Sequence, residues 1–339
     1  MPPAARHWRP LIFACFFLSG ASGLILEMVW TRQLTLVFGS TTLAISTVLT
    51  AFMGGLGLGS WLASRFGDRL RNPVRVYALA ELAIGVYALG VPLVIKHYPG
   101  LNLWLWGTLG DRYALLSMLR FLASAGVLLL PTTLMGATLP ILARAIVTRP
   151  FEVDGASLSL GRLYGTNLFG AVAGSFFAGF VSLPNFGIHV TNVVAACFNL
   201  TLSTAILVLG QRLGARPHRP SLDELGAELG TPTRVPVVPI PPRARRVVLG
   251  GFLVSGMTAM TLQVLWTRAL AVVVGSSAFS FTLILLGFLI GLGAGSAVFG
   301  RIADRQSQPV RALGLLHFGV VGAIGLSYLV TDKLPYFFA

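Results

Sequence analysis

Charged residues are scarce in this sequence, and acidic ones scarcest of all. Only 11% of the 339 residues are charged, with 11 acidic side chains against 25 basic ones, whereas a soluble domain carries about 25% charge. Two cysteines with no CxxC spacing and five scattered histidines predict neither a disulfide framework nor a metal site. These absences exclude an ordinary soluble enzyme and a zinc protein.

Long apolar runs are what the sequence has instead. Its residues are 55% hydrophobic, with mean hydropathy +0.80, and a membrane-spanning helix needs about 20 apolar residues. The predicted fold is an all-α polytopic membrane protein with nine spanning helices, at 11–30, 41–63, 75–95, 114–143, 163–184, 188–210, 247–266, 277–300 and 312–331. Residues 101–110 are too short to span and predict an interfacial segment. Pro131 and Pro140 predict a bent fourth helix that protrudes into the cytoplasm.

The net charge of +14 has a topological explanation. Basic residues lie in short gaps between the apolar runs, so nucleic-acid binding is not predicted. If the N-terminus lies in the cytoplasm, 19 of the 25 basic residues fall on the cytoplasmic side. The positive-inside rule therefore predicts a multi-pass protein with a cytoplasmic N-terminus and the lipid bilayer as its partner.

An internal repeat divides the chain. Residues 16–69 align without a gap onto residues 252–305, at an offset of 236, with 21 identities in 54 positions. Six spans separate the copies, which predicts two parallel halves of the major-facilitator type. The predicted domains are a cytoplasmic N-terminus (1–10), a six-helix repeat (11–210), a Pro-rich cytoplasmic linker (211–246) and an incomplete three-helix repeat (247–339), so a fragment or a truncated product is one interpretation.

Equivalent loops follow the second and eighth spans. They resemble the G-x-x-x-D-R-x-G-R-R loop of major facilitators, although both lack its later glycine. That resemblance implies a cytoplasmic latch between the two halves. The alternative is a solvated loop whose arginines only set topology. The latch residues would be Asp68, Arg69, Asp304 and Arg305.

A few polar residues interrupt the apolar runs. An ionisable residue inside a span is costly, so each predicts either an ion or substrate pathway or a structural pair. Glu27 is expected to pair with Arg32 or Arg120 if its role is structural, and Glu81 to pair with a loop arginine. Asn167 is also predicted to hydrogen-bond across helices, and Trp30, at the end of the first span, to be an interface anchor. Candidates for the substrate or ion pathway are Glu27, Arg32, Glu81, Arg120, Asn167, Gln263 and Arg268.

Glycine-rich segments at 54–60 and 287–296 superficially suggest a dinucleotide loop. They lie inside predicted membrane helices rather than in a βαβ unit. Close helix packing through small residues explains them better, and no cofactor is predicted.

A family resemblance emerges from motifs in order. Four motifs follow one another along the chain: Glu27-x-x-Trp30-Thr31-Arg32, the glycines at 54–60, Met-Gly-Ala-Thr-Leu-Pro at 135–140 and Tyr-Gly-Thr-Asn-Leu-Phe-Gly-Ala at 164–171. Their order and spacing resemble the membrane region of bacterial fused major-facilitator/spermidine-synthase proteins. In that family the membrane region commonly precedes an aminopropyltransferase domain. No such domain, and no catalytic residue of it, is recognisable here, so catalysis by this chain alone is not expected.

The resemblance implies a location in the bacterial inner membrane and a role with polyamines. The chain would move or present a polyamine or related cation, or anchor a separate synthase domain. Two alternatives stay open: an aminopropyltransferase whose catalytic domain lies outside this chain, and a free-standing major facilitator transporter for another solute.

Overall fold

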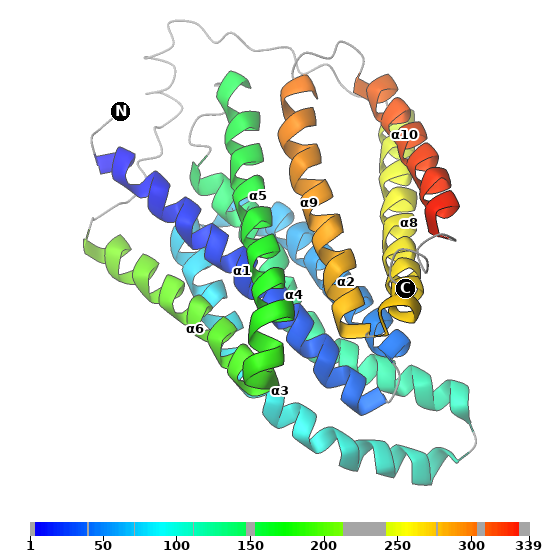
Figure 1. Cartoon of the computed structure of the whole chain (residues 1–339). Helices are drawn as coiled ribbons and strands as arrows, with labels where there is room; N and C mark the ends of the chain where they lie inside the picture. The colour runs from blue at the N-terminus through cyan, green and yellow to red at the C-terminus, as the bar shows by residue number, and fades with distance from the viewer. Residues whose placement is uncertain are drawn as a thin grey trace, which may run out of the picture.

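The computed structural model describes residues 4–38, 41–70, 72–110, 112–146, 153–212, 242–275, 277–303 and 309–331. Throughout these ranges the regular structure is helical, with no strand, as Figure 1 shows. The all-α prediction is thus confirmed for the described residues. The elements are α1 (Ala4–Phe38), α2 (Thr41–Phe66), η1 (Gly67–Arg69), α3 (Pro73–Leu109), α4 (Tyr113–Ile146), α5 (Val153–Phe176), η2 (Phe177–Ser182), α6 (Leu183–Arg212), α8 (Pro242–Val274), α9 (Ser277–Ala303) and α10 (Pro309–Thr331).

Eight segments of the described chain are long and apolar enough to cross a membrane. This finding is consistent with a multi-pass membrane protein. The difference from the nine predicted spans lies in the stretch 161–208, which counts as one 48-residue segment. Gly187 interrupts it with φ 76° and ψ −177°, a conformation that glycine adopts readily. The chain folds back there, so that α5 and α6 form the two arms of a hairpin (Figure 1).

The longest helix, α3, has clear start and stop signals. The Oδ1 atom of Asn72 accepts a hydrogen bond of 3.1 Å from the backbone N–H of Arg75, and Pro73 occupies the first turn. Gly110, at φ 52°, ends the helix and donates its N–H to the carbonyl of Trp106. Residues 101–109 therefore continue α3 rather than forming a separate segment, which corrects the sequence prediction.

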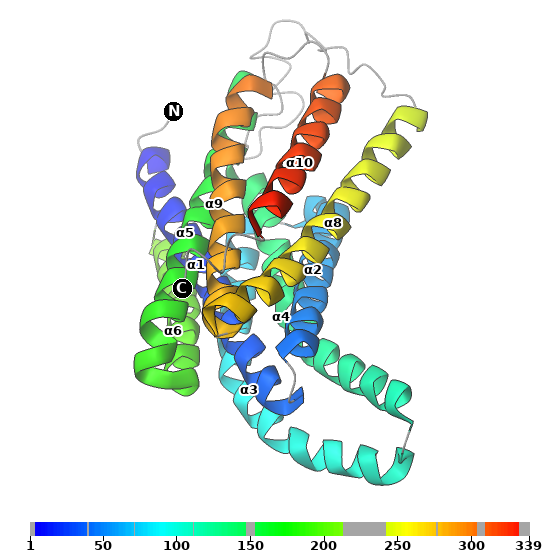
Figure 2. The ribbon, with the colours of Figure 1, turned by 45° about the vertical axis from the view of Figure 1, so that its right-hand side comes forward.

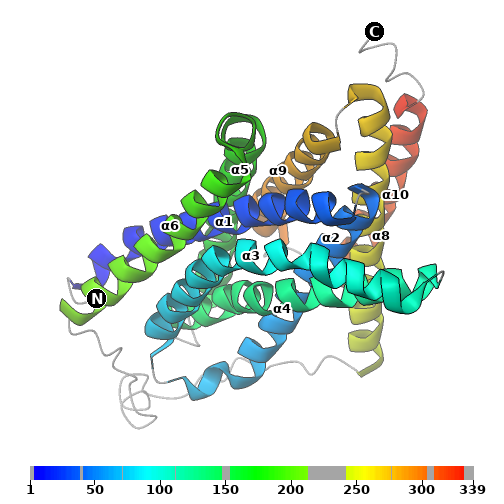
Figure 3. The same cartoon turned by 90° about the horizontal axis from the view of Figure 1, so that it is seen from below.

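Helices α3 and α4 extend beyond the rest of the bundle as a pair. At 1.5 Å per residue, their 37 and 34 residues measure about 50–55 Å, more than the ~30 Å hydrocarbon core of a bilayer. Their joined ends run side by side away from the other helices (Figures 1 and 3). Trp104 and Trp106 are exposed on this extension. An interfacial position for these tryptophans stays a prediction.

Within residues 4–212, each helix packs mainly against one partner. The most extensive pairs are α2 with α4, α1 with α5 and α3 with α6. Glycine allows two of these pairs to approach closely, because a Cβ at Gly59 would collide with the Thr133 backbone of α4, and one at Gly170 with the Phe17 backbone of α1. The small-residue interpretation of these glycines is confirmed.

The last three helices sit at one side of this body (Figures 1 and 2), and α8 and α10 are far more exposed than the helices of the first half. Only α9 packs extensively against the first half, through α5 and η2. Gly179 faces the side chain of Thr282, and the rings of Phe180 and Phe279 stack with centroids 5.8 Å apart. No residue of 311–329 in α10 is buried.

The bounds of these three helices follow the sequence repeat. Shifted by 236, the end of α1 at Phe38 becomes the end of α8 at Val274, and Thr41 becomes the start of α9. Pro73, which starts α3, becomes Pro309, which starts α10. Because equivalent positions begin or end equivalent helices, the repeat encodes helix boundaries as well as residue identities.

Candidate functional site

Polar side chains cross from helix to helix along one turn and a half of α1. The Nδ2 atom of Asn167 in α5 donates to the carbonyl of Phe16 at 3.1 Å, and the Oγ atom of Ser22 donates to the carbonyl of Ala195 in α6 at 3.0 Å. Such bonds are favoured in a bundle because lipid offers no alternative partner. The prediction that Asn167 hydrogen-bonds across helices is confirmed.

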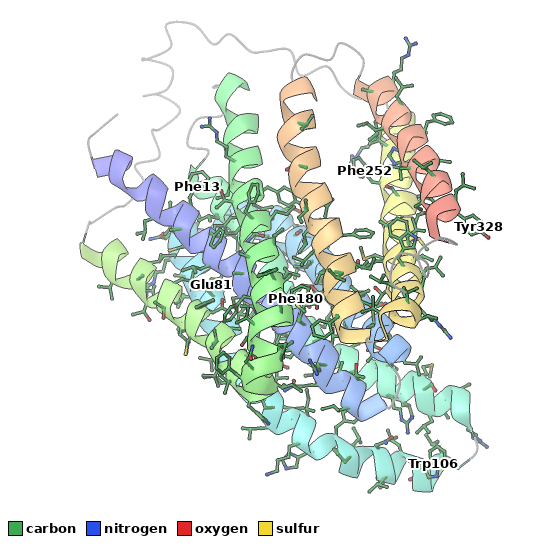
Figure 4. All side chains as sticks on the ribbon, viewed as in Figure 1. Phe13, Glu81, Trp106, Phe180, Phe252 and Tyr328 are labelled. Carbon is green, nitrogen blue, oxygen red and sulfur yellow. The ribbon has the colours of Figure 1, made fainter. Side chains whose placement is uncertain are left out.

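Glu81 belongs to the same cluster. It is 1% exposed, and its Oε1 atom accepts a hydrogen bond of 2.5 Å from the Oγ atom of Ser19 in α1. Figure 4 places it behind α1. Among the described residues its partner is this hydroxyl and no loop arginine, so the predicted pairing with arginine is not formed. Sequence reasoning did not single out Ser19 as a partner of Glu81, although Ser19 recurs as Ser255 in the second repeat.

Glu27 is the unusual group of the bundle. It lies in α1, two turns beyond Ser19, and is 1% exposed. Neither carboxylate oxygen has a hydrogen-bond partner among the residues that the structure describes. An ionised carboxylate in such surroundings is costly unless a proton or a cation compensates it. The local chemistry at Glu27 is therefore that of a buried acceptor without a donor.

The arginines predicted to pair with Glu27 lie elsewhere. Arg32 is exposed, and Arg120 in α4 donates its Nε–H to the Oδ1 atom of Asn102 in α3 at 2.8 Å. Structural pairing of Glu27 with either arginine is thus wrong for this structure. Trp30, interpreted from sequence as an interface anchor, is also fully buried in the core around Ile25 and Leu26, which corrects that interpretation.

The second repeat preserves part of the Glu27 arrangement. Gln263, its counterpart in α8, is 2% exposed, and its Nε2 atom lacks a partner among the described residues. The hydroxyl of Thr31 donates to the carbonyl of Glu27 at 2.7 Å, and Thr267 does the same to Gln263 at 2.7 Å. Arg268 is exposed like Arg32. The repeats therefore share local geometry but differ in the one group that titrates.

Arg120 lines a pocket between the first turns of α2 and α4. The pocket has a volume of about 160 Å³, and its lining consists of Leu43, Ser46, Thr47, Thr50, Ser117, Arg120 and Phe121. Sequence reasoning singled out Arg120 but missed the hydroxyls around it. The spacing of Ser46, Thr47 and Thr50 on one helix was the available signal, because positions i and i+4 share a face.

The predicted latch is described only in part. The structure describes the backbone but not the side chain of Asp68, and Asp304 and Arg305 lie outside the described residues. The guanidinium of Arg69 lies 5.7 Å from the centre of the Phe66 ring. Arg144 at the end of α4 donates to the carbonyl of Ser64 at 3.0 Å. This contact joins the loop to α4 within the first half, and the latch itself stays a prediction.

The two cysteines are free. Cys15 is buried, whereas Cys197 is exposed on α6. The described residues contain no group of three or more His, Cys, Asp or Glu side chains that could hold a metal ion. The linker predicted at 211–246 lies largely outside the described residues, and α8 already begins at Pro242.

A curated protein is similar to more than half of this chain. Polyamine aminopropyltransferase 1 of Streptomyces coelicolor is 26% identical over 210 residues, which are 61% of this chain and 36% of that protein. The chain is therefore similar to only about a third of its relative. No protein-family model matches the chain, and no solved structure matches it.

Proposed function

We propose that this chain is the membrane-embedded part of a polyamine-handling protein of the bacterial inner membrane, and that it moves or presents a polyamine cation. The observation that carries the proposal is Glu27, a buried carboxylate without a donor among the described residues. A polyamine ammonium group is a cation that would compensate it. The similarity to an aminopropyltransferase supports polyamines over other cations.

The proposed architecture follows the repeat. Both arms of the α5–α6 hairpin would cross the bilayer, which gives nine crossings in two parallel halves resembling a major facilitator. The N-terminus would lie in the cytoplasm, as the distribution of arginine favours. In this arrangement Asp68 and Asp304 would latch the cytoplasmic ends of the halves, and Glu27 and Glu81 would face the cation.

A second candidate function is anchoring. The relative is named as an aminopropyltransferase, and the aligned segment is 36% of its length. That proportion favours a membrane body whose catalytic domain lies outside this chain. In this case the helices would hold a synthase at the membrane and supply its cationic substrate. A free-standing transporter for another solute is the remaining alternative, and the flux experiment below separates it.

Uptake of labelled spermidine and putrescine into proteoliposomes that contain the purified chain tests the proposal. We expect saturable uptake by the wild-type chain and at least a tenfold lower rate in Glu27→Gln, because glutamine keeps the shape but removes the charge. The matched control is Thr35→Val, which removes a hydroxyl on the same helix that donates only to the Thr31 carbonyl, and it should keep the wild-type rate.

The outcomes distinguish the candidates. Unchanged uptake in Glu27→Gln would remove Glu27 from the mechanism. Uptake of an unrelated solute but not of polyamines would favour the free-standing transporter. If no solute enters the vesicles although the chain binds labelled spermidine, presentation or anchoring is the function. Absence of both binding and uptake would refute the polyamine proposal.

A further inference from the structure

The pocket beside Arg120 has a chemistry unlike that of the buried carboxylates. Arg120 is its only charged residue, and the other polar lining groups are hydroxyls. A positive pocket repels a polyamine, so this site does not serve the cation of the proposed function. Its lining instead matches a negatively charged ligand, because guanidinium and hydroxyl groups all donate hydrogen bonds to oxygen.

Several hydrogen-bond donors that line this pocket have no acceptor among the described residues and could bind a ligand. The Nε–H of Arg120 is committed to Asn102 at 2.8 Å, but its two Nη atoms donate to no residue that the structure describes. Many Ser and Thr hydroxyls in these helices donate to the carbonyl three or four residues earlier, as Thr31 and Thr133 do. Ser46, Thr50 and Ser117 make no such bond among the described residues.

Asn102 gives the guanidinium a fixed position. Its amide oxygen holds the Nε side from α3, and the Tyr98 hydroxyl donates to the Arg120 carbonyl at 3.1 Å. The planar guanidinium is then held with neither Nη atom bonded to a described residue, the geometry that binds carboxylate and phosphate oxygens in pairs. The partly buried Arg120 guanidinium has no counter-ion among the described residues, so an anionic ligand would neutralise its charge.

The volume of the pocket and its position along the helices limit which anions it could bind. A volume of about 160 Å³ is room for the few heavy atoms of one oxyanion group, since a water molecule takes about 30 Å³. Arg120 lies six residues into the span that begins at Ala114, and Ser46 lies three residues into the span that begins at Leu43. At 1.5 Å per residue, Ser46 lies about 5 Å inside the start of the α2 span, so the pocket is close to a span end, where lipid phosphates also lie.

We propose that the pocket formed by Arg120, Ser46, Thr50 and Ser117 binds a single oxyanion group, either the phosphate of an anionic lipid or a free phosphate or carboxylate. The two Nη atoms bind two oxygens of the ligand, and the three hydroxyls bind the others. With a lipid, the acyl chains stay in the bilayer and only the headgroup enters. The proposal is independent of the polyamine function.

Binding to the full purified chain tests this assignment in two arms. Native mass spectrometry measures retained phosphatidylglycerol against phosphatidylcholine, and thermal unfolding in detergent measures stabilisation by inorganic phosphate or acetate against chloride at equal ionic strength. We expect wild-type binding in at least one arm and at least a tenfold weaker affinity in Arg120→Gln. Arg112→Gln is the matched control, because Arg112 is exposed at the same end and does not line the pocket.

The two arms identify the source of the oxyanion. Retention of phosphatidylglycerol that free phosphate does not displace indicates a lipid headgroup, and stabilisation by the free ions alone indicates a soluble anion. Equal loss in Arg120→Gln and Arg112→Gln, unchanged affinity in Arg120→Gln, or no binding by the wild-type chain overturns the proposal. If Arg120→Gln fails to fold, Thr50→Val replaces it, with a loss of about threefold expected; unchanged affinity in that variant is equally decisive against the site.

Discussion

The buried polar side chains in this bundle differ in whether a hydrogen bond offsets the free-energy cost of their burial. Asn167 donates to a neighbouring backbone, and Glu81 accepts from Ser19, whereas Glu27 has no partner among the described residues. Because an unpaired buried carboxylate stabilises nothing by itself, its presence is better explained by function than by folding. The sequence could locate these residues, but their partners come from helices up to 151 positions away.

At this scale, the Asn167 hydrogen bond predicts a measurable stability. Asn167→Ala removes the bond from α5 to the Phe16 carbonyl, and we expect a loss of about 1–2 kcal/mol in the free energy of unfolding. Thr166→Ala is the control, since the Thr166 hydroxyl donates only within its own helix, to Arg162. Unfolding in detergent, followed by circular dichroism, measures both. Equal effects of the two variants would contradict a cross-helix role.

At the scale of helices, the two copies of the repeat have the same glycines in different surroundings. Gly55 and Gly59 of α2 lie against Thr132 and Thr133 of α4, whereas a Cβ at their counterparts Gly291 and Gly295 in α9 would meet no atom within 4 Å in the described structure. The sequence predicted close packing for both copies alike. Only the first copy shows it, because glycine permits an approach but a second helix must be there to make it.

This difference predicts opposite outcomes for equivalent substitutions. Gly59→Ala places a methyl group in the α4 backbone, and we expect it to lower the free energy of unfolding by about 1–3 kcal/mol. Gly57→Ala on the open face of α2, and Gly295→Ala in α9, should be neutral or stabilising by up to about 1 kcal/mol, since alanine favours helix. Thermal unfolding of the three variants checks the order. A destabilised Gly295→Ala would show that its face is covered.

For the whole molecule, charge decides orientation. The helix ends that carry Arg69 and Arg144 lie at one end of the bundle, and the joined ends of α3 and α4 extend from the other (Figure 1). The positive-inside rule predicts that the arginine-rich end lies in the cytoplasm. The tip of the α3–α4 pair, with the exposed Trp106, would then face the periplasm.

Sided labelling checks this topology. In a chain whose Cys15 and Cys197 are replaced by Ala, we expect Trp106→Cys to react with a membrane-impermeant maleimide in intact spheroplasts. Arg69→Cys should react only after the membrane is permeabilised. The cysteine-free parent is the control for background. The reverse pattern would mean that the N-terminus lies outside, and reaction of both sites in intact cells would contradict a spanning bundle.

The sequence by itself determined that this protein is helical, that its helices are long and apolar enough to cross a bilayer, and that the two repeats share helix starts. Length and hydropathy of a segment are local properties, and the repeat carried Thr41 and Pro73 to the helix starts at Ser277 and Pro309. The tertiary structure alone decided which faces meet. It buried Trp30, left Glu27 without a donor among the described residues, and placed Arg120 against Asn102 rather than Glu27. The physical reason is that a polar group inside a membrane protein is defined by its partners, and the partners come from other helices.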